Sequence, residues 1–139
     1  REAFIWHRLD HVNIVPFLGI ADYAKICPGG SPRLCLVSPW ISDGNIMDYL
    51  KTNPAVSPFP LLVDILDGIA YLHSHPSGPI IHGDLKANNI LLDFGVTRNR
   101  PTARLIDFGL SQTMEVDLSH GLSATSTMSN GNARWLAFE

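Results

Sequence analysis

The sequence has 139 residues, 45% of them hydrophobic, which is enough apolar material to bury the core of one globular domain. Its formal net charge is −3 and its pI is near 6.0, so there is no electrostatic reason to expect nucleic acid or an anionic membrane as the main partner. We expect no membrane span, because Asp64 and Asp67 interrupt the longest apolar candidate. We also expect no signal peptide.

The N-terminal part of the chain predicts a helix followed by a hairpin. Residues 2–9 have the apolar spacing of the end of a helix, and residues 14–20 and 34–37 have the composition of two strands. Cys27 and Cys35 are the only cysteines, and their spacing suits neither a zinc site nor a disulfide framework. We expect free thiols in a reducing, cytoplasmic location, with a disulfide across the hairpin as the alternative.

The middle of the chain predicts a linker and two helices. Residues 38–44 contain proline and glycine, a composition typical of a connection between two subdomains. A short helix is expected over residues 45–50, and a proline-broken loop over residues 52–58. Apolar residues then recur at helical spacing and predict an amphipathic helix over residues 61–72. These residues are Leu62, Ile65, Leu66, Ile69 and Leu72.

A polar loop lies between two short apolar runs, at residues 80–81 and 90–92, which are expected to be strands. The spacing of Asp84, Lys86 and Asn89 in this loop suits phosphoryl transfer. The carboxylate would orient an attacking hydroxyl and take its proton, the lysine would neutralise γ-phosphate charge, and the carboxamide oxygen would bind Mg²⁺.

The motif His-x-Asp-Leu-Lys-x-x-Asn at residues 82–89 resembles the catalytic loop of the protein kinases. A strand expected over residues 103–106 leads into Asp107-Phe108-Gly109, which resembles the kinase metal-binding motif. An earlier Asp-Phe-Gly at residues 93–95 leaves no room for a returning strand before it, so we expect a hairpin turn there. Asp107 is therefore the expected magnesium ligand.

The resemblance implies an α+β, protein-kinase-like two-lobed fold of the tyrosine-kinase-like group, present in part. The implied division is a small-lobe remnant (residues 1–37), a hinge (residues 38–44) and the catalytic-loop part of the mainly helical large lobe through the activation segment (residues 45–139). The implied activity is transfer of the ATP γ-phosphate to Ser or Thr hydroxyls of a protein substrate in signal transduction, with ATP and Mg²⁺ as cofactors. The position of Lys86, two residues after Asp84, favours Ser and Thr over Tyr.

In this resemblance Asp84 and Lys86 are catalytic, and Asn89 and Asp107 are metal ligands. His82 is expected to be structural, packing beside Phe108 in a stack that also contains two N-terminal aromatic residues. These two are Trp6 and Phe17.

The same resemblance assigns four residues to the nucleotide site. Ser38 holds the gatekeeper position at the back of the adenine pocket, and the backbone around Trp40 and Ile41 would meet the adenine edge. Because Pro39 has no N–H group, the donor is expected from Ile41. Glu2 falls where the small-lobe helix carries the glutamate that pairs with a lysine. That lysine would precede residue 1, so an exposed helix carboxylate is the alternative for Glu2.

The C-terminal part loses hydrophobic periodicity and accumulates Ser and Thr from Ser111 onward, which is the composition of a mobile segment. Residues 131–139 resemble the end of a kinase activation segment, except that Asn132 replaces a hydroxyl residue and Phe138 replaces proline. Gly83 stands where many kinases carry an arginine that pairs with a phosphorylated activation-loop residue. We therefore do not expect phosphate at residues 125–127 to activate the domain through that arginine.

Two other interpretations remain open. A pseudokinase or interaction scaffold is opposed by the intact polar residues of the catalytic loop. A small-molecule kinase of the aminoglycoside-phosphotransferase type is supported by Gly83 and opposed by Lys86 and the long activation segment. The glycine-rich loop, the small-lobe lysine and the later large-lobe helices of a kinase are not found in the sequence, so we expect this chain alone to be inactive. The sequence makes no prediction of the oligomeric state.

Overall fold

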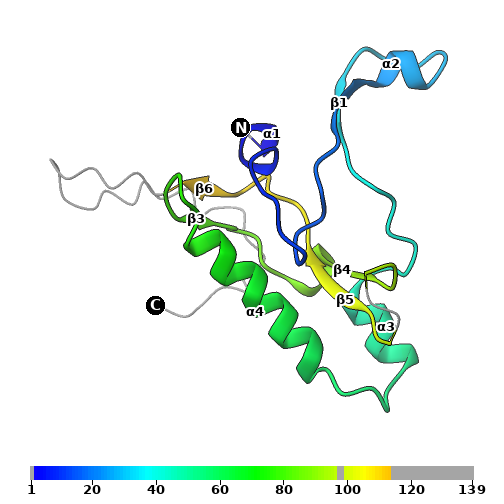
Figure 1. Ribbon diagram of the computed structural model, residues 1–139. Coiled ribbons are helices and arrows are strands. Elements are labelled where there is room, and N and C mark those ends of the chain that lie inside the picture. Colours follow the sequence, from blue (N-terminus) through cyan, green and yellow to red (C-terminus); the bar gives the residue numbers. More distant parts are fainter. Residues whose placement is uncertain (1, 97–98, 114–139) are drawn as a thin grey trace, which may run out of the picture.

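The computed structural model describes residues 2–96 and 99–113, and Figure 1 shows its elements in chain order. The helices are α1 (Glu2–Trp6), α2 (Tyr23–Ile26), α3 (Ile46–Thr52), α4 (Phe59–His73) and the 3-10 turn η1 (Ala87–Asn89). Three antiparallel pairs contain the strands β1 (Gly19–Asp22) with β2 (Leu34–Val37), β4 (Ile90–Asp93) with β5 (Thr102–Leu105), and β3 (Ile80–Ile81) with β6 (Gln112–Thr113). The mixed helix and strand content confirms the α+β prediction. The expectations for Asn132, Phe138 and residues 125–127 lie outside the described residues.

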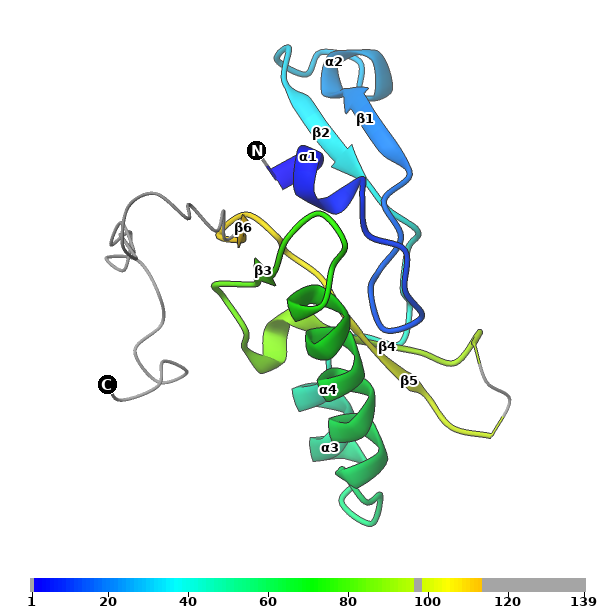
Figure 2. The ribbon, with the colours of Figure 1, turned by 60° about the vertical axis from the view of Figure 1, so that its left-hand side comes forward.

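Helix α4 packs against β5 and also contacts β3, after which the polar loop of residues 82–89 begins (Figures 1 and 2). Its buried face allows a close approach at Gly68, where an added Cβ atom would lie 3.1 Å from Leu105 Cδ1 and 3.2 Å from the carbonyl oxygen of Asn13. The predicted helix over residues 61–72 is confirmed, and Pro60 in its first turn has the fixed φ that suits a helix start. None of the helices in the described ranges is long and apolar enough to cross a membrane.

The hairpin of β1 and β2 stands apart from α4, with α2 at its tip (Figure 2). The prediction of one strand over residues 14–20 is wrong, because β1 begins only at Gly19. Ile14 instead bridges Leu105 in parallel, and the N–H of Val15 donates to the carbonyl of Leu105 at 3.0 Å. The first residues of the predicted strand thus join the edge of β5, and Pro16, which follows, has no N–H to donate to a ladder.

Helix α2 was not expected in the hairpin loop. It forms because Asp22 caps it, with its Oδ1 accepting the N–H of Ala24 at 3.1 Å. The short helix predicted at residues 45–50 is confirmed as α3, with Asn45 as its cap. Residues 38–44 between the hairpin and α3 contain no helix or strand, as a connection requires.

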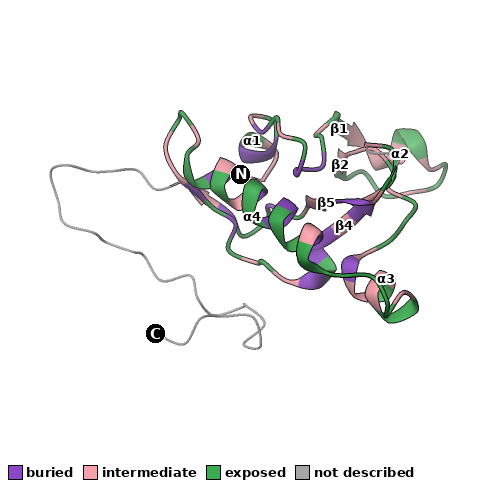
Figure 3. Ribbon diagram, turned by 60° about the horizontal axis from the view of Figure 1, so that its bottom comes forward, coloured by how far each residue is buried: buried purple, intermediate pink, exposed green. Residues whose placement is uncertain are grey.

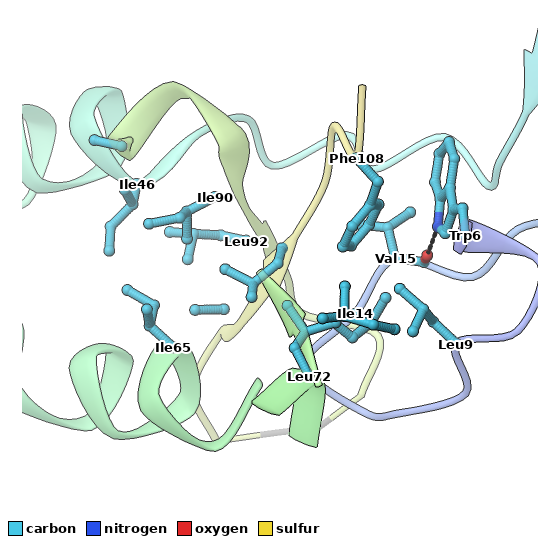
Figure 4. Packing of buried hydrophobic residues seen from close by; sticks show 14 of the residues in the cluster. Trp6, Leu9, Ile14, Val15, Ile46, Ile65, Leu72, Ile90, Leu92 and Phe108 are labelled. Atoms are coloured by element: carbon cyan, nitrogen blue, oxygen red, sulfur yellow. Dashed lines mark hydrogen bonds between the residues drawn. The ribbon is translucent and has the colours of Figure 1, made fainter. Parts of the chain in front are cut away.

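One cluster of apolar side chains joins α1, the β4–β5 pair and α4 (Figure 4). Its centre includes Ile14, Leu92 and Phe108, each exposed by 1% or less, and burying a side chain of this size stabilises the fold by roughly 1.5–3 kcal/mol. The indole Nε1 of Trp6 donates to the carbonyl of Val15 at 2.7 Å and so ties α1 to the edge of β5. Figure 3 shows β4 and β5 as largely buried, so the strands next to the predicted site residues lie within the core.

Candidate active site

In the loop between β3 and β4, two neighbouring side chains hold Asp84 in place. The ammonium group of Lys86 contacts Oδ2 of Asp84, and the amide nitrogen of Asn89 donates to the same Oδ2 at 3.0 Å and to the main-chain carbonyl of Asp84 at 2.9 Å. Within the described part of the chain, Oδ1 of Asp84 has no hydrogen-bond partner. Oδ2 is thus fixed by two partners, whereas Oδ1 keeps its capacity to accept a hydrogen bond.

The amide orientation of Asn89 also decides which of its atoms is available. Because its nitrogen is engaged by Asp84, its carbonyl oxygen Oδ1 is the atom left for a cation. Asn89 is 6% exposed and lies in η1, where its main-chain carbonyl accepts the N–H of Ile106 at 3.0 Å. This bond joins Asn89 to Ile106, the residue directly before Asp107.

The ring of His82 forms a hydrogen bond to the main chain of the loop through one nitrogen and a second bond outside the loop through the other, and these bonds select one tautomer. Its Nδ1 accepts the backbone N–H of Asp84 at 3.3 Å, so its Nε2 carries the hydrogen and donates to the carbonyl of Ile106 at 3.2 Å. Burial lowers the pKa of His82, although the bond to Ile106 and the negative charges of Asp107 and Asp84 act in the opposite direction. With both nitrogens engaged, His82 cannot serve as the base.

The aromatic stack expected around His82 is confirmed. The ring centroids of His82 and Phe108 are 5.1 Å apart, those of Phe108 and Trp6 are 5.8 Å apart, and those of Trp6 and Phe17 are 5.4 Å apart. Phe108 is completely buried, while the preceding Asp107 is exposed. The stack therefore anchors the Asp-Phe-Gly motif through its phenylalanine.

Asp107 has a backbone φ of +71°, which is uncommon for a residue with a side chain. Such a conformation persists where the surroundings enforce it, often at functional sites. Its Oδ1 accepts the N–H of Gly109 at 3.3 Å. A Cβ atom built on Gly109 would lie 3.2 Å from Oδ1 of Asp107 and 3.6 Å from Oε2 of Glu2, so the two carboxylates flank the same glycine.

Glu2 is half-buried at this place, and burial raises the pKa of its carboxyl group, with the negative charge of Asp107 as the second cause. The structure therefore brings Glu2 to the candidate site. Two adjacent carboxylates favour the binding of a cation between or beside them.

The donor set fits Mg²⁺ bound together with a nucleotide. In the described ranges, no group of three or more His, Cys, Asp or Glu side chains could hold a metal ion by itself. Asp107 and Asn89 offer one carboxylate and one carboxamide oxygen, and Mg²⁺ in phosphoryl-transfer enzymes usually takes one or two such ligands and completes its shell with phosphates and water.

The earlier Asp-Phe-Gly sequence forms the predicted turn between β4 and β5. Asp93 is paired with Thr102 in the strand ladder, and its Oδ1 accepts the N–H of Gly95 at 2.7 Å. Its Oδ2 lies 2.9 Å from Nε of Arg104, as an ion pair. The carboxylate of Asp93 is thus engaged within the hairpin, which agrees with the choice of Asp107 as the ligand.

The residues predicted for the adenine pocket lie together on the connection between β2 and α3. Ser38 is half-buried and its hydroxyl donates to the carbonyl of Pro39 at 3.4 Å, while Ile41 packs against the apolar core. The side chain of Trp40 is 91% exposed. Among the described residues, no hydrogen bond joins these positions to the catalytic loop, so their roles toward a nucleotide stay predictions.

Ser111 was expected in a mobile segment, and for this residue the expectation is wrong. It is fully buried, its hydroxyl donates to the carbonyl of His82 at 2.8 Å, and Gln112 and Thr113 form β6. Composition alone suggested mobility, because a pairing between two-residue strands leaves almost no periodic signal in a sequence.

Comparison with known proteins agrees with this geometry. The family model described as "Protein kinase domain" matches residues 1–139. Serine/threonine-protein kinase STY46 of Arabidopsis thaliana is 32% identical over 143 residues, covering 100% of this chain and 21% of that protein. Serine/threonine-protein kinase VIK of the same plant is 34% identical over 141 residues, covering 99% of this chain and 30% of that protein. Dual specificity protein kinase zakA of Dictyostelium discoideum is 38% identical over 125 residues, covering 79% of this chain and 15% of that protein.

The chain spans less than a third of the length of each of these relatives. Within that span, the match extends from α1, through the loop of Asp84, to the segment after Asp107. The resemblance inferred from the motifs is confirmed over the whole sequence, and the chain belongs to the protein kinase domain family.

Proposed function

We propose that the full-length protein is an ATP-dependent protein kinase that phosphorylates Ser and Thr hydroxyls of proteins in signalling. The observation that carries this proposal is the arrangement of Asp84, whose Oδ2 is fixed by Lys86 and Asn89 while its Oδ1 has no hydrogen-bond partner among the described residues. The names of the relatives, which are serine/threonine and dual-specificity kinases, support the choice of acceptor.

In this proposal Asp84 acts on the protein substrate. Its Oδ1 accepts a hydrogen bond from the attacking hydroxyl and takes the proton as the oxygen reaches the γ-phosphorus. Lys86 lies on Oδ2 of the same carboxylate and brings positive charge close to the transferring phosphoryl group. The bond from Asn89 keeps the carboxylate from rotating, so the open oxygen keeps its direction.

Asp107 and Asn89 would hold Mg²⁺ on the nucleotide. When bound, this ion neutralises phosphate charge and orients the γ-phosphate. Glu2 lies beside Asp107 and would pair with the small-lobe lysine that faces the phosphates. The connection with Ser38, Trp40 and Ile41 would bind adenine.

The proposal includes the division into a small-lobe remnant (residues 1–37), a hinge (residues 38–44) and a large-lobe portion (residues 45–139). It also includes a cytoplasmic location, supported by the name of one relative, calmodulin-binding receptor-like cytoplasmic kinase 1 of Arabidopsis thaliana. Another relative is named a probable LRR receptor-like kinase, so this part of the proposal needs its own localisation experiment.

The experiment compares Asp84→Asn and Asp107→Asn in the full-length protein, measuring turnover on Ser-, Thr- and Tyr-containing peptides and the affinity for ATP with Mg²⁺. Asp84→Asn is expected to lower turnover by a factor of about 10² or more with little change in nucleotide affinity, because the base acts on the hydroxyl. Asp107→Asn is expected to weaken the binding of ATP with Mg²⁺, because a charged ligand is lost.

Asp93→Asn is the matched control, since it changes an aspartate in the same tripeptide outside the site. It is expected to leave both measurements near those of the parent. Equal losses of affinity in the Asp84 and Asp107 variants would contradict the assigned roles. A parent protein that binds nucleotide without transferring phosphate would favour the scaffold interpretation instead.

A further inference from the structure

Residues 110–113 lie antiparallel to residues 80–83, and their contacts continue beyond the short strand pair. In β3 and β6, Ile80 is paired with Thr113 and Ile81 with Gln112. One step further in the same register, the hydroxyl of Ser111 donates to the carbonyl of His82 at 2.8 Å. The serine side chain thus extends the ladder toward the catalytic loop.

The backbone explains why a side chain makes this contact. The N–H of Ser111 donates to the carbonyl of Phe108 at 3.0 Å in the turn that follows the Asp-Phe-Gly motif, so it cannot also serve the carbonyl of His82. Ser111 is completely buried and His82 is 5% exposed, so water cannot readily replace the hydroxyl. Loss of the hydroxyl would leave a buried carbonyl without a donor.

His82 connects this contact to the candidate active site. Its ring accepts the N–H of Asp84 and donates to the carbonyl of Ile106, the residue directly before Asp107. The hydroxyl of Ser111 therefore holds, through one histidine, both the residue proposed as base and the strand end that carries the proposed metal ligand.

We infer that Ser111 is a positioning residue for phosphoryl transfer: its hydroxyl bond to the carbonyl of His82 keeps Asp107 in place for Mg²⁺ and nucleotide. This inference rests on the proposed function. Ser111 touches neither the substrate nor the cofactor in this assignment, and it acts through His82.

The test uses Ser111→Ala and Ser111→Thr in the full-length protein, with two readouts besides turnover. The first is the Mg²⁺ concentration that gives half-maximal binding of ATP, and the second is hydrogen exchange of the amides at residues 106–110. Ser111→Ala is expected to raise the Mg²⁺ requirement at least threefold and to speed exchange about tenfold, because the segment opens more easily. Ser111→Thr keeps the hydroxyl and is expected to restore both values toward those of the parent.

Ser74→Ala is the matched control, because Ser74 also donates its hydroxyl to a main-chain carbonyl, that of Ala70 at 2.7 Å, but lies exposed at the end of α4. It should leave the Mg²⁺ requirement unchanged. If Ser111→Ala does not fold, Ser111→Cys supplies the comparison, since a thiol fills similar space and is a weaker donor.

The outcomes separate the two claims. A parent protein without Mg²⁺-dependent nucleotide binding would overturn the proposed function and this inference with it. A parent that binds nucleotide normally, with a Ser111→Ala variant that loses thermal stability but keeps the same Mg²⁺ requirement, would overturn this inference alone and leave Ser111 a purely structural residue.

Discussion

The guanidinium group of Arg100 binds the carboxylate of Asp64 through two hydrogen bonds, of 2.7 Å and 2.9 Å, and thereby joins the β4–β5 hairpin to α4. Oδ2 of Asp64 also accepts the N–H of Ala103 at 3.0 Å, at the start of the strand that leads to Asp107. Burial by itself would raise the pKa of Asp64, but the hydrogen bonds from Arg100 and Ala103 and the charge of Arg100 outweigh it and leave the pKa lowered.

Asp64→Ala is expected to destabilise the kinase domain by about 2 kcal/mol, because it removes the carboxylate that binds the partly exposed guanidinium of Arg100 and leaves the buried N–H of Ala103 without its acceptor. Because the folded pKa lies below the unfolded value, the contribution of Asp64 is fully present above about pH 4 and is lost as the pH falls through the folded pKa. Urea unfolding at pH 7 and under acidic conditions measures both effects. Asp67→Ala changes an exposed aspartate on the same helix and should cost little. Equal effects of the two substitutions would contradict this role of Asp64.

His82 gives the domain a pH dependence in a different range. Its folded pKa is lowered, chiefly by burial, so the unfolded state takes up a proton first and stability falls as the pH drops below about 6.5. Protonation would also remove the acceptor for the N–H of Asp84. His82→Gln is expected to be less stable than the parent at pH 7.5 but to lose less stability between pH 7.5 and 5.5.

The measurement is the free energy of unfolding at several pH values in this range. His73→Gln is the control for the same substitution at an exposed position, because His73 lies exposed at the end of α4. If His82→Gln and the parent show the same slope of stability against pH, the histidine is not held neutral in the folded state.

The elements that were predicted correctly are those specified by residues close together in the sequence. Helix α4, the short helix α3 and the β4–β5 turn at the first Asp-Phe-Gly all follow from periodicity or turn chemistry in a few adjacent residues. The stack of His82 and Phe108 was predicted through the family motifs, because composition carries no information about which distant rings meet.

The unpredicted features depend on contacts between segments far apart in the chain. Ile14 and Val15 have the composition of a strand, but their partner is Leu105, far along the chain, and not the next strand. The bonds of Ser111 to His82 and of Asp64 to Ala103 likewise join separate elements. A buried polar residue can be assigned its partner only when the packing of those elements is known.

Gly83 is required by close packing as well as by its backbone conformation. Its φ is +81°, and a Cβ atom at this position would lie 2.6 Å from the carbonyl oxygen of Leu110. Gly44 has nearly the same φ, +77°, but a Cβ atom there would meet nothing within 4 Å. Comparing the two glycines therefore separates the free-energy cost of a positive φ from the cost of a Cβ contact with Leu110.

Gly44→Ala is expected to destabilise the domain by about 1 kcal/mol, the usual cost of a left-handed conformation for a residue with a side chain. Gly83→Ala should cost about 2–4 kcal/mol, since backbone atoms of Leu110 must also move. It should also weaken the contact between Ser111 and His82, which lies one step along the same ladder, and so raise the Mg²⁺ requirement of nucleotide binding. Thermal unfolding and nucleotide binding of both variants check this. Equal destabilisation by the two substitutions would show that Leu110 does not restrict residue 83, and that glycine stands there only for its backbone conformation.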